Sequence, residues 1–180
     1  MIRARLVPTA AFAAALTALA APQALAAPQA PAAQQVSTQD TAWMRAAHQS
    51  NLAEIAAGKD AQQHATTDCV KKVGAVLVRD HGKLDTDLKA LASKLGVTLP
   101  TGPNATQKQD LAALQRKAGT PAYDTAWLKT EEAGHRKTLA ATDKELRAGS
   151  DAEVLAAARK ARPVVAAHLK MVEGGTCRPM

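Results

Sequence analysis

The chain has few of the residues on which several classes of protein depend. Among its 180 residues, two are cysteines and four are aromatic, namely Phe12, Trp43, Tyr123 and Trp127. So few aromatic rings exclude the stacking surfaces that bind single-stranded nucleic acid. The sequence also lacks the run of basic residues that indicates a duplex-binding surface. We therefore expect no nucleic-acid partner.

Long apolar segments are also missing. The one apolar run, over residues 9–20, is rich in alanine and too short for a membrane-spanning helix of roughly 20 residues, so we expect no transmembrane segment in the mature protein. Arg3 and Arg5 precede this run and Ala-Leu-Ala follows it at 24–26. This order is typical of a secretory signal, and it predicts a signal peptide over 1–26 and an exported protein that is secreted, periplasmic or associated with the cell envelope.

The part that follows the predicted signal peptide is mildly basic. Residues 27–39 are rich in Pro, Ala and Gln without apolar periodicity, which predicts a flexible leader before one domain at 40–177. Without Arg3 and Arg5, 21 of the 23 basic residues remain against 16 acidic ones. The resulting net charge of +5 is compatible with an anionic polymer or lipid of the envelope as a partner.

The domain is rich in Ala, Leu, Lys and Glu, with apolar residues three and four positions apart and no alternation typical of strands. This pattern predicts an all-α fold with four long helices. Their predicted ranges are about 40–65, from a cap at Thr66 or Thr67 to Gly96, from Thr120-Pro121 to Gly149, and from a Ser150–Glu153 capping box to about 173 with a kink at Pro163.

A long connection between the second and third helices decides the topology. Residues 96–120 contain one short predicted helix near 105–117 and are long enough to cross the length of the bundle. Such a crossover would bring Cys69 and Cys177 to the same end of the bundle, where they could form a disulfide. The oxidising compartments that exported proteins reach favour this bond. Two free thiols are the alternative.

Histidines lie on the apolar faces of different predicted helices. His81, His135 and His168 each fall near the centre of an apolar stripe. At 1.5 Å per residue, His81, His135 and Glu54 lie level at mid-bundle, and His168 lies about one helical turn away. His48 falls towards the opposite end, so we exclude it from a shared site.

Two interpretations of these residues stay open. The first is a metal site that includes the Glu-x-x-His of Glu132 and His135, with ligand types that suit iron, zinc or copper and the candidate set Glu54, His81, Glu132, His135 and His168. The second is a polar layer in the core, in which the imidazoles hydrogen-bond to Glu54, Asp80 or Glu131. General acid–base chemistry is a third possibility, but no nucleophile is apparent.

Short motifs in a fixed order resemble the DUF4142 family of exported bacterial proteins over residues 40–173. They are Leu52-Ala53-Glu54-Ile55, Val78-Arg79-Asp80-His81, Leu95-Gly96-Val97-Thr98-Leu99-Pro100, Ala133-Gly134-His135, Pro163 and His168. The resemblance implies a ferritin-like four-helix bundle and leaves the biochemical role open.

The di-iron pattern of ferritin-like proteins is met only in part. That pattern takes a Glu from each of two helices and Glu-x-x-His from each of the other two. Glu132 and His135 supply one such motif, but a valine stands three residues before both His81 and His168. We therefore do not expect a ferroxidase of the usual kind, and we predict no catalytic reaction. The alternative to a metal-binding protein is a structural or interaction protein of the cell envelope.

Overall fold

The computed structural model describes residues 36–179, and this part of the chain contains helices, turns and connections but no strand. The all-α prediction is confirmed. The predicted signal peptide, 1–26, and most of the predicted leader, 27–39, lie outside the described residues. The first helix begins at Thr38 after the cap at Ser37, so it starts two residues earlier than expected.

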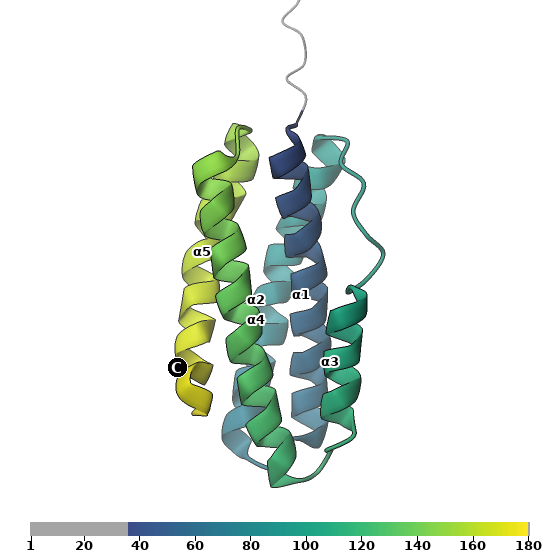
Figure 1. Cartoon of the computed structure of the whole chain (residues 1–180), viewed down its shortest axis with the longest axis vertical. Coiled ribbons are helices and arrows are strands. Elements are labelled where there is room, and N and C mark those ends of the chain that lie inside the picture. The colour runs from purple at the N-terminus through teal and green to yellow at the C-terminus, as the bar shows by residue number, and fades with distance from the viewer. Residues whose placement is uncertain (1–35, 180) are drawn as a thin grey trace, which may run out of the picture. The chain divides into compact units, whose positions relative to one another are not determined.

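Four long helices form the bundle and a shorter one packs beside it (Figure 1). In Figure 1, α1 and α5 run downwards, α2 and α4 run upwards, and α3 lies along α1. Their bounds are α1 Thr38–His64, α2 Asp68–Lys94, α3 Ala105–Gln115, α4 Pro121–Ala148 and α5 Ala152–Val172, followed by the 3-10 turn η1 Glu173–Gly175.

Most helix starts follow the predicted caps, with one correction. The Thr67 side chain caps α2, and α4 begins at Pro121. The predicted Ser150–Glu153 capping box is wrong, because Asp151 is the N-cap of α5 and accepts from two backbone N–H groups. Ser150 instead donates from its backbone and its hydroxyl to the buried carboxylate of Asp40, which lies at the start of α1.

The connection from α2 to α4 crosses the length of the bundle, as predicted, so α2 and α4 are parallel. At the end of the crossover, the Gly119 N–H donates to the His64 carbonyl at 2.9 Å, which fixes the start of α4 beside the α1–α2 turn. This arrangement brings the end of α5 to the start of α2. Cys69 and Cys177 form a disulfide there, with their Cα atoms 6.1 Å apart. The ferritin-like assignment stays a prediction.

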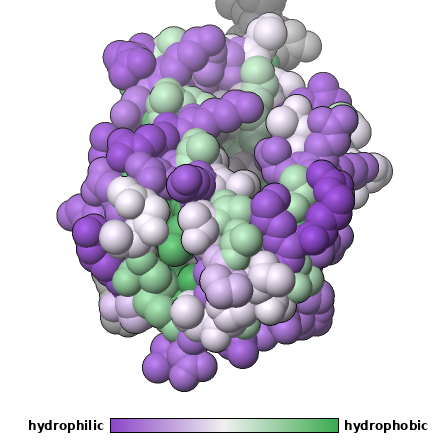
Figure 2. Space-filling view, turned by 60° about the horizontal axis from the view of Figure 1, so that its bottom comes forward, coloured by the Kyte–Doolittle hydropathy of each residue, from purple (hydrophilic) through white to green (hydrophobic). Residues whose placement is uncertain are grey.

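Two apolar clusters fill the ends of the bundle. The cluster near the α1–α2 turn includes Leu77, Tyr123, Trp127 and Met171, and the cluster at the other end includes Trp43, Met44, Leu88 and Val154. Between them lies a layer of buried polar side chains. In Figure 2, hydrophilic side chains dominate the visible face and apolar residues occupy small areas between them. Within residues 36–179, no helix combines the length and apolarity that a membrane span needs.

Candidate metal centre

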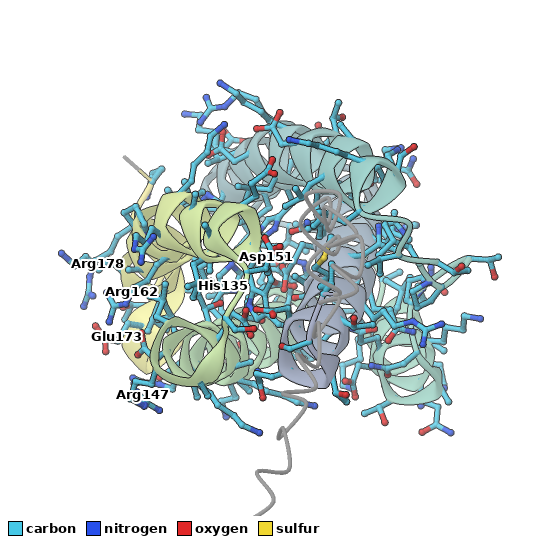
Figure 3. The ribbon with its side chains drawn as sticks, turned by 90° about the horizontal axis from the view of Figure 1, so that it is seen from above. His135, Arg147, Asp151, Arg162, Glu173 and Arg178 are labelled. Carbon is cyan, nitrogen blue, oxygen red and sulfur yellow. A yellow bond between two sulfur atoms is a disulfide. The ribbon has the colours of Figure 1, made fainter. Side chains whose placement is uncertain are left out.

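Three histidines from three helices meet in the polar layer. His81 of α2, His135 of α4 and His168 of α5 are each only 1% exposed, and their ring centroids lie 5.0 to 5.7 Å apart. One ring nitrogen of each lies within 4.8 Å of the other two. Figure 3 shows His135 inside the bundle, whereas Arg162 and Arg147 project from its surface. His168, expected about one turn away, lies level with the other two.

One nitrogen of each imidazole already has a hydrogen-bond acceptor. The pairs are His81 Nδ1 with Asn51 Oδ1 at 2.9 Å, His135 Nδ1 with the Glu131 carbonyl at 2.7 Å, and His168 Nε2 with Asp80 Oδ2 at 3.0 Å. An amide oxygen, a carbonyl and a carboxylate accept hydrogen bonds, so each pair assigns the ring proton to the outer nitrogen. Histidines that bind metals are oriented by acceptors of these kinds.

The inner nitrogens consequently carry lone pairs and face one another. His81 Nε2 lies 3.2 Å from His168 Nδ1. Two nitrogens bound at 2.0–2.1 Å to one tetrahedral metal ion would be about 3.4 Å apart, so this separation already suits a shared ion. His135 Nε2 is buried without any hydrogen-bond partner. It lies 4.0 Å from Glu54 Oε2.

Two buried carboxyl groups adjoin the histidines. Glu54 is 7% exposed and Glu131 is 3% exposed, and the Oε2 atom of each lacks a hydrogen-bond partner. Burial by itself raises the pKa of Glu54, but the positive charge of a protonated His135 and the interaction with Glu131 outweigh it and lower this pKa. Burial and the charge of Glu54 raise the pKa of Glu131 well above its usual value. Glu54 is therefore the better anionic ligand of the two.

Burial also favours the neutral form of His81 and His168. It lowers the pKa of His81 to about 4, and it lowers the pKa of His168 despite the opposing effect of Asp80. Metal ions bind imidazole in its neutral form. Burial therefore favours, for these two histidines, the state that metal ligands require.

Glu132 does not belong to this group, which corrects the predicted ligand set. Its carboxylate accepts from Arg136 on the same helix and from the backbone N–H groups of Gly174 and Gly175. Glu132 thus forms a surface ion pair with Arg136 and holds the turn after α5, and it does not act with His135 as a Glu-x-x-His ligand pair. Glu131, one residue earlier, faces the interior instead.

His48 is excluded from the site, as expected, and has a different environment. Its ring contacts Asp85 at 2.6 Å and the Pro100 carbonyl at 3.0 Å, and it thereby connects α1 and α2 to the crossover. It makes a useful reference, because it is a buried histidine of the same bundle outside the group of three.

A groove between α1, α3 and α4 reaches the carboxyl groups from outside. Its volume is about 610 Å³, and both Glu54 and Glu131 line it. Gly134 lines it opposite Glu54, and a Cβ atom at Gly134 would lie 3.4 Å from Glu54 Oε1. The absence of a side chain at this position leaves room for the carboxylate beside the groove.

Sequence reasoning missed Asn51 altogether and gave Asp80 and Glu131 only as hydrogen-bond partners. The signal for Asn51 is its position three residues before Glu54, on the same face of α1. Asp80 shares no face with His81, but it reaches His168 from the neighbouring helix. The hydrogen bond between Asp80 and His168 depends on how α2 packs against α5, which the sequence pattern of either helix alone does not show.

Comparisons with known proteins place the chain in a family. No curated protein and no solved structure matches it. The family model described as "Domain of unknown function (DUF4142)" matches residues 25–174. This match covers all four long helices and every histidine of the central group. The chain therefore belongs to the DUF4142 family.

Proposed function

We propose that this protein binds one divalent transition-metal ion between His81, His135 and His168, with Glu54 as the fourth ligand. The supporting observation is the set of inner nitrogens: each imidazole gives its other nitrogen to an acceptor, and the free lone pairs converge in a buried space. Buried polar atoms without partners are rare in folded proteins. A cation would satisfy His135 Nε2 and Glu54 Oε2 together.

The donor set indicates zinc, iron or copper rather than magnesium or calcium. Three imidazoles and one carboxylate provide the nitrogen-rich ligands that these metals prefer, whereas the alkaline-earth ions prefer oxygen. Four ligands around a small buried space suit tetrahedral zinc best, so zinc is our first choice. No reaction is assigned to the ion.

The protein is further proposed to act outside the cytoplasm, as the predicted signal peptide implies. The disulfide between Cys69 and Cys177 supports this proposal, because disulfides persist in oxidising compartments. The envelope-protein alternative stays a prediction. The basic side chains that it would use are divided among the helices, and several pair with acids, for example Lys94 with Glu153 and Lys160 with Asp87.

Competition titration tests the proposal. The mature protein, purified without a histidine tag, is titrated with zinc in the presence of a coloured chelator. We expect one ion per chain, at least about a hundredfold weaker binding in His81→Ala and His135→Ala, and unchanged binding in His48→Ala, which removes a buried histidine outside the group. Equal binding by all four proteins would reject the site.

A further inference from the structure

The groove between α1, α3 and α4 has the dimensions of a small-molecule site. Its volume of about 610 Å³ lies within the range of roughly 300–1,000 Å³ that is usual for ligand pockets. Much of its lining is apolar, with alanines of α1 and α4, Trp43, and Leu111 and Leu114 of α3. An apolar body would therefore gain by entering it.

The buried part of the groove offers one unused polar group. Glu131 lines the groove, is 3% exposed, and has an Oε2 atom without a hydrogen-bond partner. The proposed metal ligands do not include it. A hydroxyl group can both donate and accept, so it can pair with this carboxyl group whether or not the carboxyl carries a proton.

The charged residues in the exposed lining of the groove are mainly cationic. Lys108 of α3 and Lys129 and Lys137 of α4 line it, and within residues 36–179 none of the three lies within 4.0 Å of a carboxylate. Asp110 is the acidic residue among the exposed lining. This imbalance favours a ligand whose outer end is negatively charged.

We propose that this groove binds a small organic anion with an apolar body and a hydroxyl group at its inner end. The hydroxyl pairs with Glu131, the body lies against the alanines and leucines, and the anionic end faces the lysines. Hydroxylated aromatic or aliphatic carboxylates have this chemistry. The inference goes beyond metal binding and does not require a bound ion, although Glu131 Oε2 lies 3.7 Å from the Nδ1 atom of His135, one of the proposed ligands.

Three related probes test the two ends of the ligand separately. Para-hydroxybenzoate has both groups, benzoate lacks the hydroxyl, and para-hydroxybenzyl alcohol lacks the charge. We expect para-hydroxybenzoate to bind about tenfold or more tightly than either of the others, because each lost contact is one hydrogen bond or one charge interaction. Titrations followed by NMR on metal-free and on zinc-loaded protein measure the three affinities, and shifts should concentrate at the groove residues.

Variants connect each preference to its residue. Glu131→Leu should abolish the advantage of para-hydroxybenzoate over benzoate, whereas Glu131→Gln, which keeps a hydrogen-bonding group, should retain it. Lys137→Glu should weaken both carboxylates at least about threefold and leave the alcohol unchanged. Lys170→Glu reverses the charge of an exposed lysine on α5 outside the groove and should change nothing.

Several results would overturn the proposal. They are equal affinities for the three probes, no binding at millimolar concentration, shifts away from the groove, or a hydroxyl preference that survives in Glu131→Leu. Thermal unfolding of each variant shows whether it is folded, and Glu131→Gln provides the folded comparison if Glu131→Leu is not. Zinc binding is measured on the same preparations, so failure of the groove and failure of the metal site give different results.

Discussion

The Nε2 atom of His81 lies 3.2 Å from the Nδ1 atom of His168, and hydrogen bonds at the other side of each ring leave both atoms with lone pairs. Two facing lone pairs at this distance repel unless a cation lies between them or, with the Asn51 amide turned over, the His81 proton moves to Nε2 and is donated to His168 Nδ1. An additional shared proton would charge the pair, and burial opposes this, as the lowered pKa of both residues indicates. The metal ion that we propose would resolve the conflict, because metal ions bind neutral imidazole rings.

The orienting role of Asn51 gives the first prediction. Asn51→Leu removes the acceptor of the His81 Nδ1 proton, so the ring loses its fixed tautomer and orientation. We expect zinc affinity to fall roughly 10–100-fold, as is usual when such a partner is removed. Asn51→Asp keeps an oxygen acceptor and should bind zinc within about threefold of the wild type. Similar losses in both variants would show that Asn51 does not act through hydrogen bonding.

The close contact between α1 and α2 gives the second prediction. A Cβ atom on Gly74 would lie 2.7 Å from the Gly58 carbonyl oxygen and 3.0 Å from Ala61 Cβ, so the two backbones approach too closely for a side chain. Gly74→Ala should reduce the free energy of unfolding by about 1–3 kcal/mol. Gly82→Ala in the same helix meets open space and should increase it by about 0.5–1 kcal/mol.

Denaturant titration of the two glycine variants measures both effects. We expect the changes in the free energy of unfolding to have opposite signs. The two substitutions gain the same helix propensity and differ only in the space available for the added methyl group. If Gly74→Ala were as stable as Gly82→Ala, the close packing of α1 on α2 would be wrong.

The disulfide gives the third prediction. It joins residues 108 positions apart, and the chain-entropy model assigns such a loop a stabilisation on the order of 4–5 kcal/mol, as an upper value. The double variant Cys69→Ser, Cys177→Ser should therefore unfold at a clearly lower denaturant concentration. Reductant should lower the midpoint of the wild type and leave that of the variant unchanged. A midpoint of the wild type that ignores reductant would indicate free thiols.

Glu145 gives a prediction for pH dependence. Its side chain is fully buried, and burial together with the neighbouring Asp40 raises its pKa to about 7. The folded protein consequently binds more protons than the unfolded chain between about pH 4.5 and 7, so Glu145 makes stability fall as pH rises through this range. Glu145→Gln removes the ionisation and keeps an amide of similar shape.

We expect Glu145→Gln to unfold at a higher denaturant concentration than the wild type above about pH 7, and at nearly the same concentration near pH 4.5. Unfolding curves at several pH values compare the two proteins. The explanation fails if the difference between them does not change with pH.

The sequence predicted the helices well because their end signals are local. Thr67, Pro121 and the glycine after α2 each act within one turn of their own position. The cap of α5 was misplaced because Ser150 bonds to Asp40, more than a hundred residues away. The topology followed from the length of the crossover and the two cysteines, which are constraints on the whole chain.

The candidate site was predictable only in part. The apolar stripes located His81, His135 and His168, but α1 has no such stripe to follow, since its apolar residues Leu52 and Ile55 are only partly buried. After Trp43 and Met44, the buried face of α1 contains polar and small residues instead, among them Asn51 and Glu54. Similarly, the motif spacing indicated Glu132, whereas the buried neighbours Trp127 and Leu128 share their face with Glu131.

The most direct test of the account is X-ray absorption spectroscopy of the zinc-loaded, tag-free mature protein beside His135→Ala. We predict a zinc ion with three imidazole nitrogens at 2.0–2.1 Å and one carboxylate oxygen, and the loss of one imidazole from the first shell in the variant. A spectrum of the wild type with one imidazole or none, or the same spectrum from both proteins, would contradict a metal centre between the three histidines.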